Sequence, residues 1–463
     1  MTAASTPKPQ QIGLGLAVAI GLASMLGAGV FVVFHEADAL TSKVSDRWAL
    51  LIAIALAGLV ATLNAASVYQ LAKVVSRAGG VYAYSRVYVG PNTSFIAGFS
   101  FIFGKIGSIA AIGLVFGLYV WPAQPVLAAV LAIAVLAALN LLGINRTAKV
   151  ALALAISTVG FLLVTIVWGF AHGVEAIPAS GTAVTNSAAT AGVEAAQAPH
   201  VHTLDSVFNF IAAGNVSPIL SAAALVFFAF AGYARVATLG DEVRNPTRNI
   251  PRAIAISLSA VLVLYFALAI MLQNTLGSML AQSSAPLVTF WQDSTISFSW
   301  PPSAIETIVK IFASAASLGS MLALLAGVSR TAATMAEDRE LPTWFSARNR
   351  HGSPWLAEVL IALGAIALVQ FGRLDWVIGF SSLSVLLYYA IGHFSALRQL
   401  AGQSGPSVQT ASRAARITRA ATAWLGMLLC AVLLISVPGP ALWLSAIVIV
   451  AALFVRRVAR SHD

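Results

Sequence analysis

The sequence predicts an all-α polytopic membrane protein with twelve transmembrane helices, ten of them arranged as a five-plus-five inverted repeat. The first observation is composition: 59% of the 463 residues are hydrophobic and only 9% are charged, whereas a soluble domain is about 25% charged. The second is twelve long apolar runs, and the third is a pair of glycine clusters that interrupt the first and sixth runs. A mean hydropathy of +0.88 excludes ordinary soluble enzymes, disordered chains, collagens and disulfide-rich secreted domains.

Each apolar run is long enough to cross a bilayer, which takes about 20 residues. The run after the polar tail 1–11 is longer than the core of a signal peptide, so we interpret it as a first span and not a cleaved signal. The predicted spans are 12–34, 48–72, 94–120, 125–143, 148–171, 219–238, 253–275, 304–334, 355–371, 374–397, 420–437 and 440–456.

The charges predict the orientation of the spans. The chain has 26 Lys and Arg against 16 Asp and Glu, a net charge of +10. In a soluble protein this excess would suggest nucleic acid. In a membrane protein basic residues mark cytoplasmic loops, and a cytoplasmic N-terminus places most of them on that side. We therefore expect a multi-pass protein of the cell (cytoplasmic or inner) membrane, with both termini cytoplasmic, the lipid bilayer as partner and no nucleic acid.

The chain divides by composition into six predicted parts. The loop at 172–218 is rich in Ala, Ser, Thr and Gly and is expected outside the cell, with a short amphipathic helix at 202–211. His200 and His202 have no third ligand nearby and are interpreted as part of a solvated loop. The parts are the tail 1–11, the first repeat 12–171, the loop 172–218, the second repeat 219–397, the cytoplasmic loop 398–419, and 420–463 with the last two spans and a basic tail.

The glycine clusters predict two broken helices near the middle of the membrane. Span 1 contains Gly27-Ala28-Gly29 and span 6 contains Ala231-Gly232. Either cluster alone is more typical of close helix packing. Because the two spans are separated by five, an odd number, a five-span repeat must be inserted upside down in its second copy. Unwound backbone in such repeats can bind polar groups: helix N-termini favour a carboxylate, and free carbonyls favour an ammonium. A zwitterionic amino acid offers both.

Four motifs carry a resemblance to a known family. GAGVF in span 1, FFAFAGY followed by DEVRNPTRNIPRAI at span 6, RAGGVYAYSR at 77–86 and SRTAATMAEDRELPTWF at 329–345 resemble permeases of the amino acid–polyamine–organocation (APC) superfamily. They occur in the family's order and span most of the chain. The resemblance implies the LeuT-type/APC fold with discontinuous helices 1 and 6. It also implies a secondary active transporter that works by alternating access.

The resemblance also implies roles for residues at the two breaks. The backbone of Gly27, Ala28 and Gly29 would hold the substrate carboxylate, and carbonyls at or near the following residues would hold its ammonium: Met25, Leu26, Phe228 and Ala231, beside Gly232. Phe228 would cover the site as a gate, with Phe230 or Tyr233 as further candidates. For Phe230 and Tyr233 simple packing is an equal alternative. Ser108 of span 3 is expected to line the pocket.

The sequence departs from the family pattern at two positions linked to coupling. Where several relatives carry an acid after the span-6 glycine, this chain has Ala234 followed by Arg235, and Ser157-Thr158 stand where some proton-coupled relatives carry a lysine. The remaining candidate is Lys105 in span 3, since a lysine deep in a span must face the interior or a cavity. The alternative is a lysine that snorkels to the interface. We expect Lys105 to replace a sodium ion or to report proton occupancy.

Several weaker polar candidates complete the prediction. Ser317 and Ser320, with Ser314, recur at helical spacing in span 8 and are candidate ion ligands, although serines also serve as ordinary helix contacts. His393 is interpreted as a hydrogen-bonded histidine near the cytoplasmic interface. Asp241 and Glu242, with Arg244, Arg248 and Arg252, are expected to form a cytoplasmic gate network with Arg339 and its neighbours. A solvated loop is an equal alternative.

No metal cluster, phosphate loop or nucleophile motif is present in the sequence, so we expect no enzyme, no cofactor and no metal. The expected function is transport of neutral amino acids, with H⁺ or Na⁺ as a candidate partner, by proton coupling or exchange. The alternatives are transport of polyamines or other small amines on the same fold, and a nutrient sensor or channel that does not transport.

Overall fold

The computed structural model is helical throughout the part of the chain that it describes. This part comprises residues 12–27, 29–42, 44, 48–75, 79–141, 144–172, 216–238, 243–293, 301–371, 373–402 and 412–437, with the single residues 450, 453 and 456. Within it, an isolated parallel β-bridge between Ile12 and Val243 joins the start of the first span to the segment that follows the sixth. The prediction of an all-helical fold is confirmed.

The helices of the first half begin close to the predicted span boundaries. They are α1 (Leu14–Met25), α2 (Gly29–Thr41), α3 (Ala49–Ala72), α4 (Val81–Tyr88), α5 (Pro91–Val120), α6 (Pro125–Asn140) and α7 (Ile144–His172). Proline stands in the first turn of α5 and α6, where its missing N–H costs no helical hydrogen bond.

The second half repeats this pattern of long apolar helices with short connecting elements. Its elements are α9 (Val216–Phe230), η1 (Ala231–Tyr233), α10 (Ala234–Ala237), α11 (Pro246–Leu276), η2 (Gly277–Met279), α12 (Pro286–Asp293), α13 (Pro302–Glu337), η3 (Thr343–Ser346), α14 (Trp355–Val369) and α15 (Leu374–Ala401), followed by α17 (Arg413–Ser436).

The first eleven predicted spans each coincide with a helix or a broken helix. Among the described residues, seven helices are long and apolar enough to cross a membrane, and the bent pair α1 and α2, counted as one span, makes an eighth. The helices α6 and α14 and the later part of α7 are shorter apolar helices. The predicted span 440–456 and the loop 172–218 fall largely outside the described residues, as does the helix expected at 202–211.

Two short helices were missed because a search for long apolar runs cannot find them. The helix α4 follows Gly79 and Gly80, whose φ angles of 111° and 58° lie in the region that favours glycine. These two glycines turn the chain sharply between α3 and α4. The second missed helix, α12, lies between α11 and α13 and contacts both.

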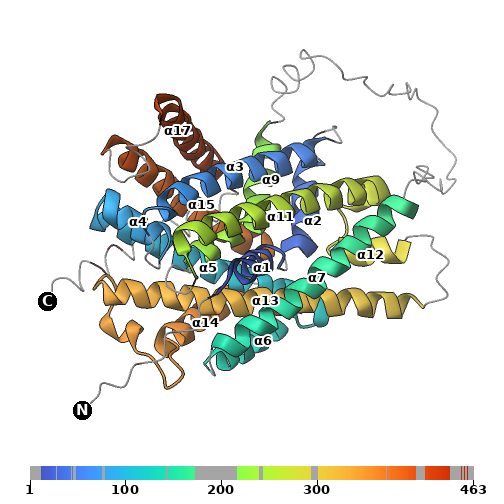
Figure 1. The fold of residues 1–463 in the computed structure, drawn as a ribbon. Coiled ribbons are helices and arrows are strands. Elements are labelled where there is room, and N and C mark those ends of the chain that lie inside the picture. Colours follow the sequence, from blue (N-terminus) through green and yellow to red (C-terminus); the bar gives the residue numbers. More distant parts are fainter. Residues whose placement is uncertain are drawn as a thin grey trace.

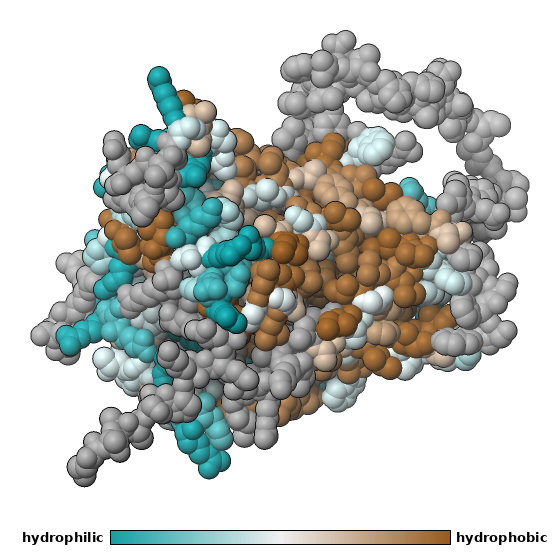
Figure 2. Space-filling model, in the orientation of Figure 1, coloured by the Kyte–Doolittle hydropathy of each residue, from teal (hydrophilic) through white to brown (hydrophobic). Residues whose placement is uncertain are grey.

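The helices pack into one bundle with α1 at its centre. Figure 1 shows α1 lying between α11 and α13, and it contacts both of them and α7. The face seen in Figure 2 carries a broad apolar band and gathers many of its hydrophilic residues at one end. Val263 and Ile435 are each 72% exposed, as expected for side chains that face lipid.

The two interrupted spans run antiparallel and cross at their breaks. The first half of span 1, α1, contacts η1 and α10, which follow the break of span 6. The second half of span 1, α2, contacts α9, which precedes it. The first half of each span therefore contacts the second half of the other span, as expected for two helices that run in opposite directions.

Candidate substrate site at the two helix breaks

The first break interrupts span 1 between Met25 and Gly29. The axes of α1 and α2 differ by 41°, and the N–H of Leu26 still donates to the Leu22 carbonyl at 2.7 Å. The Cβ of Ser320 on α13 lies 2.6 Å from the position that a Cβ on Gly27 would occupy. Residue 27 must therefore be glycine if α13 is to approach this closely. Ala28, predicted as part of the carboxylate site, lies outside the described residues.

The second break replaces α-helix by a single 3₁₀ turn, Ala231–Tyr233. A Cβ on Gly232 would overlap the Ser24 carbonyl group and lie 2.6 Å from the Met25 nitrogen. The two breaks thus touch backbone to backbone, and the glycine predicted from the sequence is what permits the contact.

Lys105 of α5 reaches the second break. Its Nζ donates a hydrogen bond of 2.9 Å to the carbonyl oxygen of Ala231, and the residue is only 2% exposed. Among the described residues, no carboxylate forms an ion pair with Lys105 within 4.0 Å. The side chain therefore points into the bundle and does not snorkel to an interface.

Tyr265 of α11 joins both breaks and was missed by the sequence reasoning. Its hydroxyl lies 2.7 Å from the Met25 carbonyl oxygen and 3.3 Å from that of Ala229, so one O–H can donate to either carbonyl. Its ring packs on Phe230 at 5.0 Å between centroids. A lone tyrosine in an apolar span gives no sequence signal, because its partners are backbone atoms of distant segments.

Two carbonyls that the resemblance assigns to the substrate ammonium have protein donors in this structure. The Ala231 carbonyl accepts from Lys105, and the Met25 carbonyl accepts from Tyr265. Lys105 thus contacts one of the carbonyls that the resemblance assigns to the substrate ammonium. The Lys105 hydrogen bond occupies one of the two acceptor positions of the Ala231 oxygen.

The three candidate gate aromatics have different surroundings. Phe228 is 8% exposed, and its Cε1 lies 3.3 Å from a Cβ position on Gly29, beside the first break. Phe230 is fully buried against Tyr265, and Tyr233 stacks on Tyr389 with ring centroids 5.1 Å apart. Phe228 is therefore the aromatic that lies at both breaks.

The candidate serines also separate into two groups. Ser320 faces Gly27, is 1% exposed, and its Oγ has no hydrogen-bond partner among the described residues. Ser317 donates to the Ala313 carbonyl of its own helix at 2.7 Å, and Ser314 does the same with Lys310 at 2.6 Å. The hydroxyls of Ser108 and Ser381 pair at 2.7 Å. Only the Ser320 hydroxyl of this set is both buried and available to a ligand.

A buried arginine follows the second break. Arg235 of α10 is 5% exposed, its Nη1 donates to Thr238 Oγ1 at 2.8 Å, and its Nε has no partner among the described residues. Its side chain lies directly over Gly327 of α13, where an added Cβ would overlap it. Arg330, one turn further along α13, is close enough to interact with Arg235 electrostatically. Arg330 also interacts electrostatically with Glu358, so this side of the break carries two arginines with one acid beside Arg330.

His393 lies in the bundle interior, and both of its ring nitrogens have hydrogen-bond partners. It is 0% exposed; Nδ1 lies 2.8 Å from Ser67 Oγ, and Nε2 lies 2.7 Å from Asn64 Oδ1. Because an amide oxygen only accepts, Nε2 carries the proton and Nδ1 accepts from Ser67. Cys430 of α17 also donates to Asn64 Oδ1 at 3.2 Å. The predicted hydrogen bonding is present, and it links α3, α15 and α17.

A network of ion pairs at one end of the bundle joins α4, the loop after α13 and Arg456. Arg86 Nη1 and Arg456 Nη2 each lie 2.9 Å from a different oxygen of Glu340, whose side chain is 1% exposed. Tyr82 donates to Asp338 at 2.8 Å. Burial, together with this hydrogen bond, raises the pKa of Tyr82 above its usual value. The predicted partners Asp241 and Glu242 lie outside the described residues.

The family model described as "Amino acid permease" matches residues 17–454, which includes both breaks. The chain belongs to the amino acid permease family. The permeases are membrane transporters, so the protein is a transporter and not an enzyme.

Individual relatives agree with this assignment. The permease is 38% identical over 390 residues to an uncharacterized transporter of Mycobacterium tuberculosis, covering 84% of this chain and 80% of that protein. It is 26% identical to the chloroplastic cationic amino acid transporter 6 of Arabidopsis thaliana, over 80% of this chain and 62% of the plant protein.

A solved structure shares the fold. A crystallised variant of the Eremococcus coleocola manganese transporter superposes with a TM-score of 0.57, covering 99% of this permease and 98% of that chain. At 15% sequence identity the likeness concerns the fold alone.

Proposed function

We propose that this permease is a secondary active transporter that moves neutral amino acids across the cytoplasmic membrane by alternating access, driven by protons or by exchange. The observation that carries the proposal is the contact between the two helix breaks, with the Lys105 ammonium on the Ala231 carbonyl. Unwound backbone at this depth is stable only where protein or ligand satisfies its polar groups. The breaks thus supply polar backbone groups in the interior of the bundle.

The architecture that we propose is twelve spans, with inverted repeats at 12–171 and 219–397 and two peripheral spans. The antiparallel crossing of the broken spans supports the inversion. Both termini would be cytoplasmic, since most basic loop residues then lie on that side. The end of the bundle that carries Arg86, Glu340 and Arg456 is the cytoplasmic end in this orientation.

The proposed substrate site uses both broken helices. The amides of Gly27, Ala28 and Gly29 at the start of α2 would hold a carboxylate, because a helix N-terminus carries unpaired N–H groups and partial positive charge. The unpartnered Ser320 hydroxyl facing Gly27 is placed to add a donor. The ammonium would bind the carbonyl of Ala231, and Phe228 would cover the site.

Charge supports a neutral substrate. The side chains at the breaks include no acid among the described residues, and two cations, Lys105 and Arg235, are buried beside them. A second positive charge on the substrate would meet uncompensated positive charge in a medium of low dielectric constant. Some relatives are named cationic amino acid transporters. We propose that the buried charge of Arg235 makes this permease select against cationic amino acids.

Lys105 supports proton coupling through competition for one carbonyl. A protonated Lys105 donates to Ala231 in place of a substrate ammonium. A neutral amine is a weaker donor and would release that oxygen to the substrate. Substrate binding and proton release from Lys105 would then be linked.

Counterflow in proteoliposomes tests the proposal. Vesicles containing the purified permease and an unlabelled amino acid should accumulate the same radiolabelled amino acid when it is neutral, and the rate should change with an imposed pH gradient. A thermal-shift series should show stabilisation by neutral amino acids and none by amines that lack a carboxylate. Stabilisation by such amines would contradict the carboxylate site, and saturable binding without counterflow would indicate a sensor.

A further inference from the structure

A groove on the surface of the bundle lies apart from the two helix breaks. It has a volume of about 440 Å³ and is bounded by α3, α11 and α17. Its walls belong to three spans, and exposed side chains such as Tyr69 and Thr62 line it. In a membrane, a groove open between spans faces lipid and not water.

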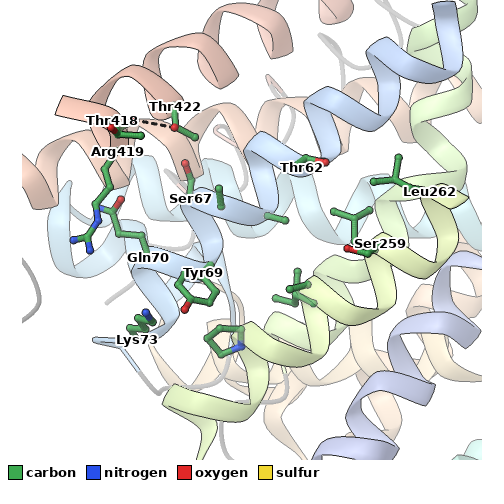
Figure 3. Close-up of a pocket in the computed structure, with 16 residues that line it drawn as sticks. Thr62, Ser67, Tyr69, Gln70, Lys73, Ser259, Leu262, Thr418, Arg419 and Thr422 are labelled. Atoms are coloured by element: carbon green, nitrogen blue, oxygen red, sulfur yellow. Dashed lines mark hydrogen bonds between the residues drawn. The ribbon is translucent and has the colours of Figure 1, made fainter. Parts of the chain in front are cut away.

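The basic side chains of the groove gather at one end. Figure 3 shows Lys73, Gln70 and Arg419 together at that end, and Thr62, Ser259 and Leu262 at the other. Lys73 caps the C-terminal end of α3, and Arg419 lies near the start of α17. Both positions are at the membrane boundary of their helices, so this end of the groove lies at the headgroup level.

The length of the groove matches one leaflet. From Lys73 back to Thr62 is eleven residues of α3, or about 16 Å at 1.5 Å per residue. Half of a hydrocarbon core of about 30 Å is about 15 Å. Ile254, Leu258 and Leu262 of α11 line the opposite wall over the same length. The groove thus runs from the headgroup level to about the bilayer midplane along apolar side chains.

The inner wall of the groove is held in place by the scaffold behind it. Gln70 Nε2 donates to Gln399 Oε1 at 2.8 Å, and Ser67 bonds His393 at 2.8 Å. Lys73 Nζ lies 4.1 Å from the centroid of the Tyr69 ring. A site whose walls are already fixed loses little entropy when a ligand binds.

We propose that this groove binds one anionic phospholipid, with its phosphate between Lys73 and Arg419 and an acyl chain along α11. The cationic end pairs with the phosphate, and the apolar walls accept the chain. In the proposed orientation the lipid belongs to the cytoplasmic leaflet. Basic residues facing that leaflet attract anionic lipids in general. A single groove with fixed walls would instead bind one lipid molecule at one position.

The test is native mass spectrometry of the full-length permease in detergent with added phosphatidylglycerol or phosphatidylcholine. We expect one retained phosphatidylglycerol per protein and at least a tenfold preference over phosphatidylcholine. Lys73→Gln combined with Arg419→Gln should reduce that preference at least tenfold. Ala66→Trp, which fills the exposed middle of the groove without changing a charge, should reduce binding of both lipids. The control is Arg416→Gln on α17, an exposed arginine outside the groove, which should behave as wild type.

Three results would overturn the proposal. One is equal retention of both lipids by the wild-type protein. Another is loss of binding in Arg416→Gln equal to the loss in the double variant. The third is a thermal shift with glycerophosphoglycerol that equals the shift with phosphatidylglycerol. Because glycerophosphoglycerol has the headgroup without acyl chains, this result would indicate a phosphate site and not a lipid site. If the double variant does not fold, Ala66→Trp and the wild-type comparison still decide the question.

Discussion

The ammonium of Lys105 donates a 2.9 Å hydrogen bond to the carbonyl oxygen of Ala231, the first residue of the turn that breaks span 6. A charged group buried at this depth is costly unless it is paired. Here the unwound carbonyl accepts the hydrogen bond of Lys105, so the lysine and the broken helix stabilise each other. In the proposed function a substrate ammonium would compete with Lys105 for this oxygen, and substrate binding would then be linked to the charge on this side chain.

Lys105→Met tests this competition directly. The variant cannot change charge or donate to Ala231, so we expect uptake in proteoliposomes to lose its pH dependence. Lys105→Arg keeps a charge that does not titrate near neutrality and should lower uptake at least tenfold at every pH. If uptake by Lys105→Met depends on pH as uptake by the wild type does, Lys105 has no role in coupling.

Gly232→Ala tests the contact between the breaks. The new methyl group would overlap the Ser24 carbonyl, so backbone must move, at a cost of about 1–3 kcal/mol. We expect transport to fall at least tenfold. Gly160→Ala is the matched control because a Cβ there meets nothing within 4 Å, and alanine is favoured in a helix by up to about 1 kcal/mol. Equal transport by the two variants would contradict the model of touching breaks.

The spans and both breaks could be predicted from the sequence because they rest on local properties. Apolar length reveals a span, and Gly27 and Gly232 reveal where a helix can open. Tyr265 and the position of His393 could not be predicted. Their roles depend on which distant segments lie opposite them: Met25 is 240 residues from Tyr265, and Asn64 is 329 residues from His393. Local sequence patterns do not show which distant segments are in contact.

Tyr265→Phe removes the hydroxyl that joins the breaks and keeps the ring. The Met25 carbonyl loses its 2.7 Å donor, and an unpaired buried carbonyl costs about 1–3 kcal/mol. We expect this cost to appear as a change in KM for the substrate at least as large as that in maximal rate, because the carbonyl lies at the proposed ammonium site. A lowered melting temperature with unchanged KM would assign Tyr265 to structure alone.

Arg235→Gln tests the origin of charge selectivity. The guanidinium is buried beside the second break and forms no ion pair with a carboxylate among the described residues. Removing the charge should raise counterflow of lysine relative to leucine at least tenfold. Arg252→Gln, an exposed arginine on α11, should leave the ratio unchanged. A lysine-to-leucine ratio in Arg235→Gln equal to that of wild type would show that selectivity arises elsewhere.

Glu340→Gln should destabilise the end of the bundle that carries Arg86 and Arg456. Arg86 and Arg456 share this buried carboxylate, each at 2.9 Å, and Arg456 is itself 7% exposed. Removing one partner of a buried ion pair leaves the other charge uncompensated, at a cost of about 3–5 kcal/mol.

Glu337→Gln provides the comparison, because the Glu337–Arg348 pair is about half exposed and such surface pairs contribute under about 1 kcal/mol. Thermal unfolding in detergent should therefore show a clearly lower melting temperature for Glu340→Gln and little change for Glu337→Gln. Similar melting temperatures for both would mean that the carboxylate of Glu340 is dispensable and that apolar packing alone holds α4, the loop after α13 and Arg456 together.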